Sequence, residues 1–363
     1  MKILMFSADP NILDKDSAAA KRMREYAKRV EKLDVLVLVT NLAVPPPSGV
    51  GLAENTRAHA LTGRFLRFLK AFFRAWRMLK KEKYDLLVAQ DIEHAVLCWL
   101  LGGKWQMQIH TDIFSPYFVQ HSVPNRMRVI LAKFLIPRAS CIRVVSERIK
   151  KSILRTSDVF NIEVLPILAE PADLNAEPKR FLEFDKTILM VSRLASEKNT
   201  GLAIDAMAEV VRKHPRTGLV IVGDGSEKQN LGSRIRSLEL QKNIKMVGWQ
   251  NDTVAYYKGA DIFLLTSWYE GWGMSVVDAA RYGTAVIMTD VGLAGEVIDN
   301  GKTGLVVPAG DKDALVVAIL RLLESDGLRR DFIEAAARKV SEFPTEEAYY
   351  QKMIESWQKC SNF

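Results

Sequence analysis

Short apolar runs alternate with helix-length segments along almost the whole chain of 363 residues, and this alternation narrows the range of folds more than any other feature. The runs do not interleave polar and apolar residues, which is typical of strands buried on both faces of a parallel sheet. The pattern therefore predicts doubly wound α/β architecture. In the first half the expected strands are 2–6, 34–40, 85–89, 105–110 and 141–145, and the expected helices lie near 17–32, 60–81, 92–101, 123–137 and 146–154.

The same pattern returns in the second half, so the chain is expected to form two such domains, in keeping with its length. The segment 166–186 is rich in charge and interrupted by prolines, and we interpret it as a linker between domains at 1–165 and 187–344. A last helix within 345–363 could pack back on the first domain. The expected strands are 187–192, 218–223, 244–248, 261–266, 284–289 and 303–308, and the expected helices 311–324, 327–340 and 345–359.

Charge is distributed unevenly between the two halves. Residues 1–165 contain 27 Lys and Arg against 15 Asp and Glu, whereas residues 166–363 contain 24 against 28. A basic first half indicates an anionic partner, for which nucleic acid, a membrane surface or a phosphorylated substrate would serve. No nucleic-acid recognition motif accompanies the excess, so nucleic acid is not an expected partner.

The three cysteines, Cys98, Cys141 and Cys360, are far apart and form no CxxC motif. We therefore expect neither a disulfide nor a zinc framework, as is typical of a reducing cytoplasm. The longest apolar run, 95–101, is too short to span a bilayer, and the opening MKILMF is interpreted as a first strand rather than a signal peptide. The expected location is cytoplasmic.

The stretch SWYEGWGMSVVDAARYG at 267–283 is the most informative segment. It follows an expected strand, and a helix is expected to begin near Gly273. A strand-to-helix turn lies at the carboxyl edge of a doubly wound sheet, where ligands bind, and the start of the helix offers unpaired N–H donors to a diphosphate. Glu270 could point into that crevice, and Asp278 could reach a ribose. Alternatively, Glu270 caps the helix and Asp278 is a solvated carboxylate.

Two further strand ends carry candidate residues. Arg193 and Lys198, in VSRLASEKN, could hold a diphosphate, with arginine acting as a fork and lysine as a point charge. In the alternative reading this is a solvated loop in which Glu197 pairs with Lys198. Gly223, in VGDGSEKQNL, belongs to a GxG turn, which alone is a weak signal.

Taken in order, RLxxxK, VGDG, VGW, SxxEGxG with an acid eight residues after its glutamate, and NGKTGLVVP resemble retaining glycosyltransferases of family 4. The resemblance covers 187–320 strongly and the first half weakly, through VAQDIEHA, IHTDIF and RVVSERIKKSI. It implies the GT-B architecture, two Rossmann-like domains that face a central cleft. The second domain would bind a nucleotide-sugar and the first an acceptor.

The resemblance also implies residue roles. Arg193 and Lys198 would hold the donor diphosphate, and Glu270 would lie against the transferred sugar. Asp278 would bind the ribose, although the family has glutamate there, and His110 would face the donor sugar. The backbone after Glu270 would contact phosphate and sugar through Gly271, Trp272, Gly273, Met274 and Ser275, with Gly223 also at the donor.

A basic aromatic stretch occupies 64–83. Arg64, Arg67, Lys70, Arg74, Arg77 and Lys81 recur at three- and four-residue steps, and Phe65, Phe68, Leu69, Phe72, Trp76 and Leu79 form an apolar face. Such a helix could lie on an anionic membrane. The alternative, which we weight more heavily, is a crossover helix with its aromatic side chains in the core.

The sequence thus predicts a retaining glycosyltransferase that uses no metal and no cofactor beyond its substrate, a UDP- or GDP-linked sugar. The acceptor would be a lipid-linked or other glycan, and the enzyme would be peripheral on the inner face of a membrane. The alternatives are a sugar-nucleotide epimerase and a catalytically weak homologue that acts as a sugar-nucleotide binder or partner subunit.

Overall fold

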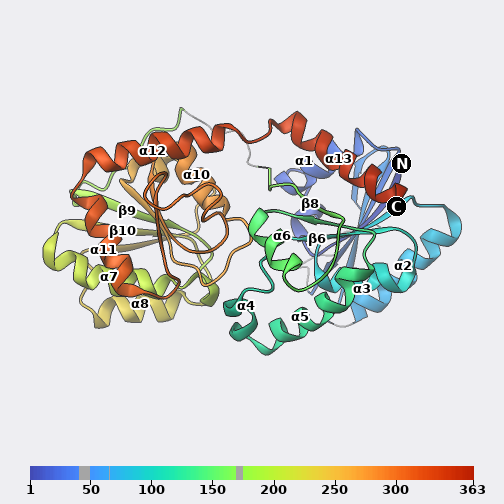
Figure 1. The fold of residues 1–363 in the computed structure, drawn as a ribbon, viewed down its shortest axis with the longest axis horizontal. Helices are drawn as coiled ribbons and strands as arrows, with labels where there is room; N and C mark the ends of the chain where they lie inside the picture. The colour runs from blue at the N-terminus through green and yellow to red at the C-terminus, as the bar shows by residue number, and fades with distance from the viewer. Residues whose placement is uncertain (41–49, 65, 169–174) are drawn as a thin grey trace. The chain divides into compact units, whose positions relative to one another are not determined.

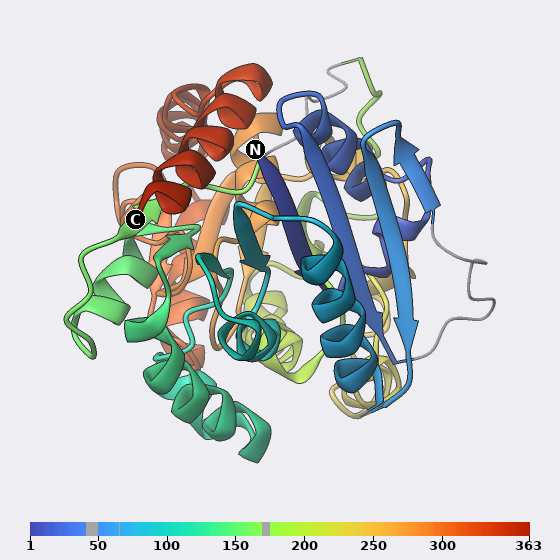
Figure 2. The same ribbon diagram turned by 90° about the vertical axis from the view of Figure 1, so that its right-hand side faces the viewer.

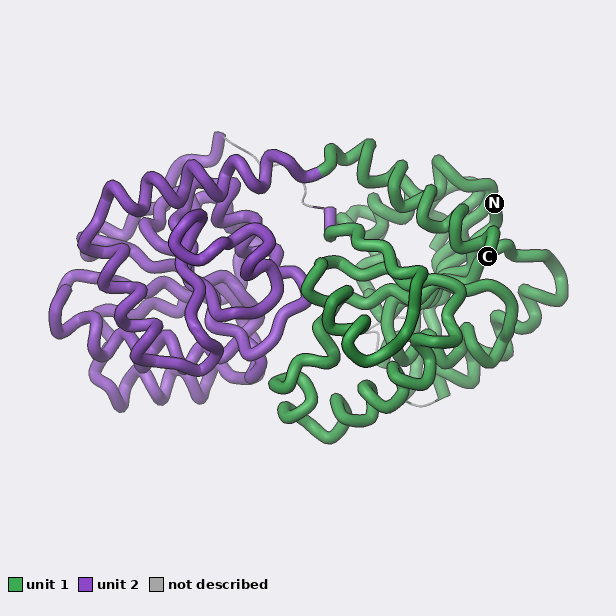
Figure 3. The backbone as a smooth tube through the Cα atoms, in the orientation of Figure 1, with its two compact units in different colours: residues 1–166, 344–363 green, residues 167–343 purple. Residues whose placement is uncertain are grey.

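The computed structural model describes residues 1–40, 50–64, 66–168 and 175–363. The chain divides into two compact units (Figure 3): unit 1 is Met1–Pro166 with Pro344–Phe363, and unit 2 is Ile167–Phe343. Phe65 of the basic stretch and residues 169–174 of the expected linker lie outside the described residues. Each unit is an α/β layer structure with its own sheet (Figure 1).

Unit 1 is built on a sheet of eight strands in the order β3-β4-β2-β1-β5-β6-β7-β8. Every neighbouring pair is parallel except β3 and β4, which are antiparallel. Figure 2 gives the view onto this unit, with its first strands in blue. The strands are β1 (Lys2–Ser7), β2 (Lys32–Val39), β3 (Val50–Ala53), β4 (Thr56–Thr62), β5 (Leu86–Ala89), β6 (Trp105–Ile109), β7 (Cys141–Val144) and β8 (Ile162–Val164).

The helices of unit 1 follow the expected order, with one displaced start. The helix expected from residue 60 begins only after β4, because the alternating TRAHALT segment pairs with β2 instead. Strands β3, β4 and β8 and helix α4 were not expected. The helices are α1 (Ala18–Ala27), α2 (Leu66–Lys81), α3 (Ile92–Leu101), α4 (Pro116–His121), α5 (Val123–Leu135), α6 (Glu147–Leu154) and α13 (Glu346–Asn362).

Unit 2 has a parallel six-stranded sheet in the order β11-β10-β9-β12-β13-β14. All six strands expected in the second half are confirmed: β9 (Lys186–Val191), β10 (Thr217–Val222), β11 (Ile244–Gly248), β12 (Ile262–Leu265), β13 (Ala285–Thr289) and β14 (Leu305–Val307). The helices are α7 (Thr200–Lys213), α8 (Lys228–Ser237), α9 (Val254–Gly259), α10 (Met274–Tyr282), α11 (Lys312–Leu323) and α12 (Asp326–Ser341). The strand order reverses between β9 and β12, which is the topological switch point of a doubly wound sheet.

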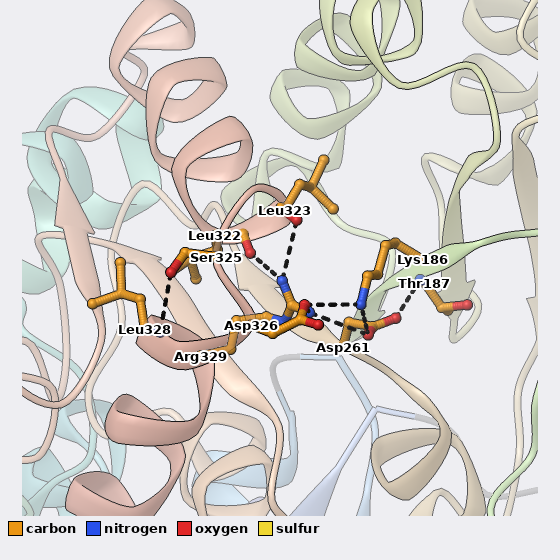
Figure 4. Close-up of polar contacts among 9 residues, drawn as sticks. All are labelled: Lys186, Thr187, Asp261, Leu322, Leu323, Ser325, Asp326, Leu328 and Arg329. Atoms are coloured by element: carbon orange, nitrogen blue, oxygen red, sulfur yellow. Dashed lines mark hydrogen bonds and ion pairs between the residues drawn. The ribbon is translucent and has the colours of Figure 1, made fainter.

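A polar network around the buried Arg329 links the amino ends of β9 and β12 to α11 and α12 (Figure 4). Asp261 Oδ2 accepts from the backbone N–H of Thr187 at 2.8 Å, and Asp261 Oδ1 lies 3.2 Å from Lys186 Nζ. Arg329 is 6% exposed and donates to the carbonyl of Leu322 and to Asp326. Its guanidinium therefore satisfies carbonyls at the end of α11 and links them to the first turn of α12.

The C-terminal helix α13 packs on unit 1. Trp357 is fully buried, its Nε1 donates to Gln106 Oε1 at 3.1 Å, and its ring lies 5.0 Å from the ring of Tyr26. Next to it, Cys360 forms a disulfide with Cys141 of β7, with their Cα atoms 5.6 Å apart. The expectation that no disulfide forms is therefore wrong. The two cysteines are 219 positions apart, and only the return of α13 to β7 brings them together.

Part of the segment interpreted as a linker is attached to unit 2. The backbone N–H of Lys179 donates to the carbonyl of Ala255 at 2.8 Å, and Lys179 Nζ donates to Tyr256 Oη at 2.8 Å. Phe184 is 9% exposed and lies over Gly218, where a Cβ would collide with its ring. Hydrogen bonds to α9 and the packing of Phe184 on β10 thus hold the end of this charged segment on unit 2.

Candidate active site

The loop that follows β9 carries both candidate cations. Its backbone is held to the loop after β10, because Leu194 N–H donates to the Asp224 carbonyl at 2.9 Å. A Cβ at Gly223 would collide with the Ser192 carbonyl oxygen, and one at Gly225 with that of Leu194. The glycines of the GxG turn therefore permit a close approach of two backbones, which positions the Arg193 loop. This local role of Gly223 requires no ligand.

The loops after β9 and β12 meet in a cluster of charged side chains. Lys198 Nζ donates to Glu270 Oε1 at 2.5 Å, and Ser267 Oγ donates to the same oxygen at 2.8 Å. The side chains of Lys198 and Glu270 are 21% and 12% exposed. Arg193 is 70% exposed and pairs with Glu197 at 2.7 Å. Glu197, and not Glu270, therefore holds Arg193, and Lys198 pairs with Glu270 rather than with its neighbour.

Helix α10 begins directly after this cluster. Gly273 caps it with φ of +98°, a left-handed conformation that favours glycine, and Met274 and Ser275 form its first turn. The first N–H groups of a helix have no acceptor within the helix, so this end favours an anion. Trp272 points away, since its indole is 4% exposed and packs against Phe343 at 5.6 Å between ring centroids. Gly271 is buried as well, so the side chain of Trp272 is part of the packing below the turn.

Asp278 lies within the same helix in a largely buried setting. Burial raises the pKa of its carboxyl to about 6, and the charge of Arg281 opposes this only in part. Burial raises the pKa of the nearby Tyr257 phenol, and the charge of Asp278 raises it further. The interpretation of Asp278 as a solvated surface carboxylate does not fit this environment.

His110 belongs to unit 1 and lies at the end of β6. Its Nδ1 is 3.2 Å from the Gln90 carbonyl, and its Nε2 is 3.1 Å from Nη1 of Arg143. Because a guanidinium can only donate, Nε2 accepts and Nδ1–H donates, which fixes one neutral tautomer. Burial, aided by the charge of Arg143, lowers the pKa of His110 to about 3. Its imidazole is therefore an oriented neutral group at physiological pH.

A pocket of about 320 Å³ lies beside His110, where the strand order of unit 1 reverses between β1 and β5. Asp91 caps α3 by accepting from His94 N–H at 2.8 Å, and its Oδ2 is also 2.8 Å from His94 Nδ1. Interaction with His94 lowers the pKa of the Asp91 carboxyl against the opposing effect of burial. Asp91 was not among the predicted site residues, although an aspartate before an apolar helix is a capping signal. The lining includes Arg67, Gln90, Asp91, His94, His110 and Thr111.

Comparison with known proteins extends these observations. The family model "Glycosyl transferase 4-like domain" matches residues 17–167, and "Glycosyl transferases group 1" matches residues 173–339. A curated Campylobacter jejuni protein is 26% identical over 293 residues, covering 77% of this chain and 78% of that protein. It is named N-acetylgalactosamine-N,N'-diacetylbacillosaminyl-diphospho-undecaprenol 4-alpha-N-acetylgalactosaminyltransferase.

Solved structures share the fold over nearly the whole chain. Sucrose-phosphate synthase from Thermosynechococcus elongatus has a TM-score of 0.80 at 19% identity, covering 99% of this chain and 98% of its own. Anabaena HepE, solved with UDP, has a TM-score of 0.73 at 19% identity, covering 99% of this chain and 100% of its own. The chain is a GT-B glycosyltransferase. The expected fold class is thereby confirmed, and the protein is an enzyme that transfers a sugar from a nucleotide-sugar.

The glycosyltransferase also has an exposed apolar surface on unit 1. It is formed by α2, α3 and α5, which Figure 1 shows next to one another. In α2 only Ala71 and Ala75 are buried among the side chains described. Phe68 and Phe72 are half-buried and Trp76 is exposed, so the interpretation that places the aromatic side chains of this helix in the core is not met. We call the α2–α5 surface the set of apolar side chains that are 40–68% exposed there: Leu66, Leu69, Phe73, Trp76, Trp99, Leu100, Val123, Met127, Ile130 and Phe134.

Cations border the α2–α5 surface. The sequence from 55 to 81 and from 113 to 146 contains no Asp or Glu. Arg67 Nη1 donates to Thr40 Oγ1 at 2.5 Å, Lys70 Nζ to the Thr62 carbonyl at 3.1 Å, and Arg74 Nη2 lies 3.2 Å from His59 Nδ1. Arg67 thus turns toward the end of β2, and Lys70 and Arg74 turn toward β4, so the apolar and basic stripes of α2 lie side by side.

Two properties of the described residues bear on the expected partners. No helix among them is long and apolar enough to cross a membrane. Within the same parts of the chain, no three His, Cys, Asp or Glu side chains gather as a metal ion would require.

Proposed function

We propose that this glycosyltransferase is a retaining, metal-independent hexosyltransferase that uses a UDP- or GDP-linked sugar. One observation carries the proposal: Arg193, the Lys198–Glu270 pair and the start of α10 lie at the carboxyl ends of β9 and β12, where the strand order reverses. Ligands of doubly wound sheets bind at this place. The UDP found in the Anabaena structure supports a nucleoside diphosphate as the leaving group.

The donor site would work mainly by electrostatics. When the bond between the anomeric carbon and the phosphate oxygen breaks, the diphosphate gains negative charge. Arg193, Lys198 and the N–H groups at the start of α10 would stabilise that charge, in the role that a metal ion plays elsewhere. Glu270 keeps Lys198 oriented through the hydrogen bond at 2.5 Å and would lie against the transferred sugar.

Retention requires that the new bond form on the face from which the diphosphate departs. In this proposal the acceptor hydroxyl oxygen bonds to the anomeric carbon as the phosphate leaves, and its proton passes to a phosphate oxygen. No base from the protein is required for this transfer. Both ring nitrogens of His110 are engaged by Gln90 and Arg143, so its neutral imidazole would contact a sugar by packing and would not titrate during the reaction.

We propose a lipid-linked glycan as the acceptor, bound by unit 1. The Campylobacter relative is named for a diphospho-undecaprenol substrate, which supports this class. The α2–α5 surface supports peripheral attachment to an anionic membrane, because exposed apolar side chains border a region with cations and no acids. Asp112, whose carboxyl pKa is raised by burial and whose Oδ1 accepts from Ser152 Oγ at 2.7 Å, is a candidate to orient the acceptor.

Nucleotide binding provides the direct test. UDP, GDP and their sugars should be screened by thermal shift, since a ligand that binds only the folded protein raises its melting temperature. We expect one nucleotide class to raise it, with and without EDTA, and the replacement Arg193→Gln to reduce the effect. Lys228→Met is the matched control, because Lys228 forms a similar exposed pair with Asp224 at 2.6 Å. The absence of any shift with all these nucleotides would contradict the donor assignment.

The stereochemical proposal needs a separate measurement. We expect the product of the active enzyme to keep the anomeric configuration of its donor, which NMR of the product determines. An inverted product would refute the retaining mechanism without affecting the donor assignment. Conversion of the donor in the absence of any acceptor would favour an epimerase.

A further inference from the structure

The α2–α5 surface contains an apolar cavity that the proposed chemistry does not use. It has a volume of about 500 Å³ and lies between α2, α3 and α5. Its apolar lining includes Leu69, Phe72 and Phe73 of α2, Val96 and Leu100 of α3, and Leu131 of α5. Since a group of water size occupies about 30 Å³ in a liquid, the cavity has room for roughly fifteen carbon-sized groups.

The cavity opens to solvent along its rim. Leu69 is 57% exposed, Phe73 55% and Leu100 54%. Large apolar side chains in contact with water around an apolar cavity disfavour the unoccupied state and indicate an apolar occupant. The basic residues of α2 along the same helix indicate that this occupant carries negative charge.

The cavity shares a wall with the polar pocket beside His110. Phe68 and Glu93 line both. On the polar side of this wall, Arg67 lines the pocket, and its buried Nε has no hydrogen-bond partner among the described residues, although Nη1 donates to Thr40. Arg128 lines the same pocket and is held by Glu93 at 2.6 Å. The apolar cavity and the polar pocket that contains Arg67 are thus neighbours, separated by Phe68 and Glu93.

We propose that the apolar cavity binds the first segment of the hydrocarbon chain of a lipid-linked acceptor, and that Arg67 binds the phosphate to which the chain is attached. The sugar of the acceptor then lies in the pocket of Gln90, Asp91 and His110. This inference rests on the proposed function and adds a subsite for a single chain, as distinct from attachment to the bilayer. Arg128 is not expected to bind the phosphate, because its guanidinium is paired with Glu93.

A series of soluble phosphates tests the subsite without knowledge of the acceptor. Farnesyl phosphate, isopentenyl phosphate and inorganic phosphate are titrated into the full chain by calorimetry, below the critical micelle concentration of the longest. We expect farnesyl phosphate to bind once per chain and isopentenyl phosphate on the order of tenfold or more weakly, because burial of each methylene contributes to binding. Equal affinity for the three phosphates would overturn the proposal.

Variants separate the cavity from the membrane surface. Leu100→Asp places a carboxylate at the cavity rim and should weaken farnesyl phosphate by on the order of tenfold or more, a loss expected when a charge replaces an apolar contact. Arg67→Gln should weaken both prenyl phosphates. Ile130→Asp, on the exposed face of α5 and outside the cavity lining, is the matched control and should leave farnesyl phosphate binding unchanged.

Binding to phosphatidylglycerol vesicles tests the alternative that this surface contacts a bilayer and not a single lipid chain. If Leu100→Asp and Ile130→Asp weaken vesicle binding equally and neither changes farnesyl phosphate binding, the face is a bilayer contact only and the subsite is refuted. Circular dichroism confirms that the variants fold. The nucleotide thermal shift is independent of these measurements, so its persistence in Leu100→Asp shows that a negative result belongs to the subsite and not to the proposed function.

Discussion

Lys198 Nζ lies 2.5 Å from Glu270 Oε1, and this side-chain pair joins the loop after β9 to the loop after β12. Ser267 adds a second donor to the same carboxylate oxygen at 2.8 Å. Backbone groups reinforce the connection, because Thr266 Oγ1 donates to the carbonyl of Lys198 at 3.0 Å and Trp268 N–H to that of Glu197 at 2.8 Å. The pair sits on the two sides of the switch point of unit 2, so either partner can be removed without touching the sheet. It is therefore the most direct place to test the chemistry.

Replacement of Glu270 by Gln should lower kcat by on the order of 10²-fold, about 2.7 kcal/mol of transition-state free energy. The amide keeps the size of the side chain but leaves Lys198 without its anionic partner. Lys198→Met should have a similar effect and should also weaken nucleotide binding. Steady-state kinetics with the donor identified by thermal shift measures both, and full activity in Glu270→Gln would show that the pair is structural.

Most strands and helices could be predicted because their signal is local. The strands β9 to β14 are apolar on both faces, which indicates a parallel sheet covered by helices on both sides. Lys198 and Glu270, 72 positions apart, are brought together only by the strand order. The resemblance to a known family placed both residues at one site. Which cation pairs with Glu197, Arg193 or Lys198, could not be predicted from the sequence.

Other features depend on contacts that no local pattern encodes. The apolar stripe of α2 suits a core or a membrane equally well, and the deciding fact is that Ala71 and Ala75, the small residues, face the sheet. The disulfide between Cys141 and Cys360 depends on where α13 returns. The pocket containing Asp91 forms where β1 and β5 are neighbours, and the order of the strands in the sheet could not be predicted from the sequence.

Asp278 should make the free energy of unfolding depend on pH. Its pKa is raised by burial to about 6 in the folded protein, from an ordinary value near 3.8. The folded state therefore holds the proton more tightly, and the cost of ionisation appears as the pH rises from about 4 to about 6. Asp278→Asn should raise the free energy of unfolding by about 1–3 kcal/mol at pH 8 and by less at pH 5. Denaturation at the two pH values measures this.

The same variant tests the role of Asp278 at the ribose. If the carboxylate accepts from a ribose hydroxyl, Asp278→Asn should weaken nucleotide binding by about tenfold at pH 8, since bonds to charged groups contribute about 1.5–3 kcal/mol. Asp331→Asn, on the exposed side of α12, is the control for charge alone. Unchanged nucleotide affinity together with a higher melting temperature would assign Asp278 to the fold and not to the donor.

The disulfide should stabilise unit 1 by about 2–5 kcal/mol, because it closes a loop of more than two hundred residues in the unfolded chain. Dithiothreitol should lower the urea midpoint of the transition that exposes Trp357, which is fully buried in the folded protein. Cys360→Ala should show the lower midpoint with or without dithiothreitol. A midpoint in the natural chain that does not respond to reductant would show that α13 is held by packing alone.

Arg329→Met should lower the stability of unit 2 by about 1–3 kcal/mol, because the buried guanidinium that donates to the carbonyl of Leu322 is lost. Arg330→Met, the exposed neighbour on α12, should be nearly neutral. The network lies at the amino ends of β9 and β12, opposite the loops that carry Arg193 and Glu270. Nucleotide affinity at a temperature where the variant is folded should therefore be unchanged, and a loss of affinity there would mean that the two ends of the sheet are coupled.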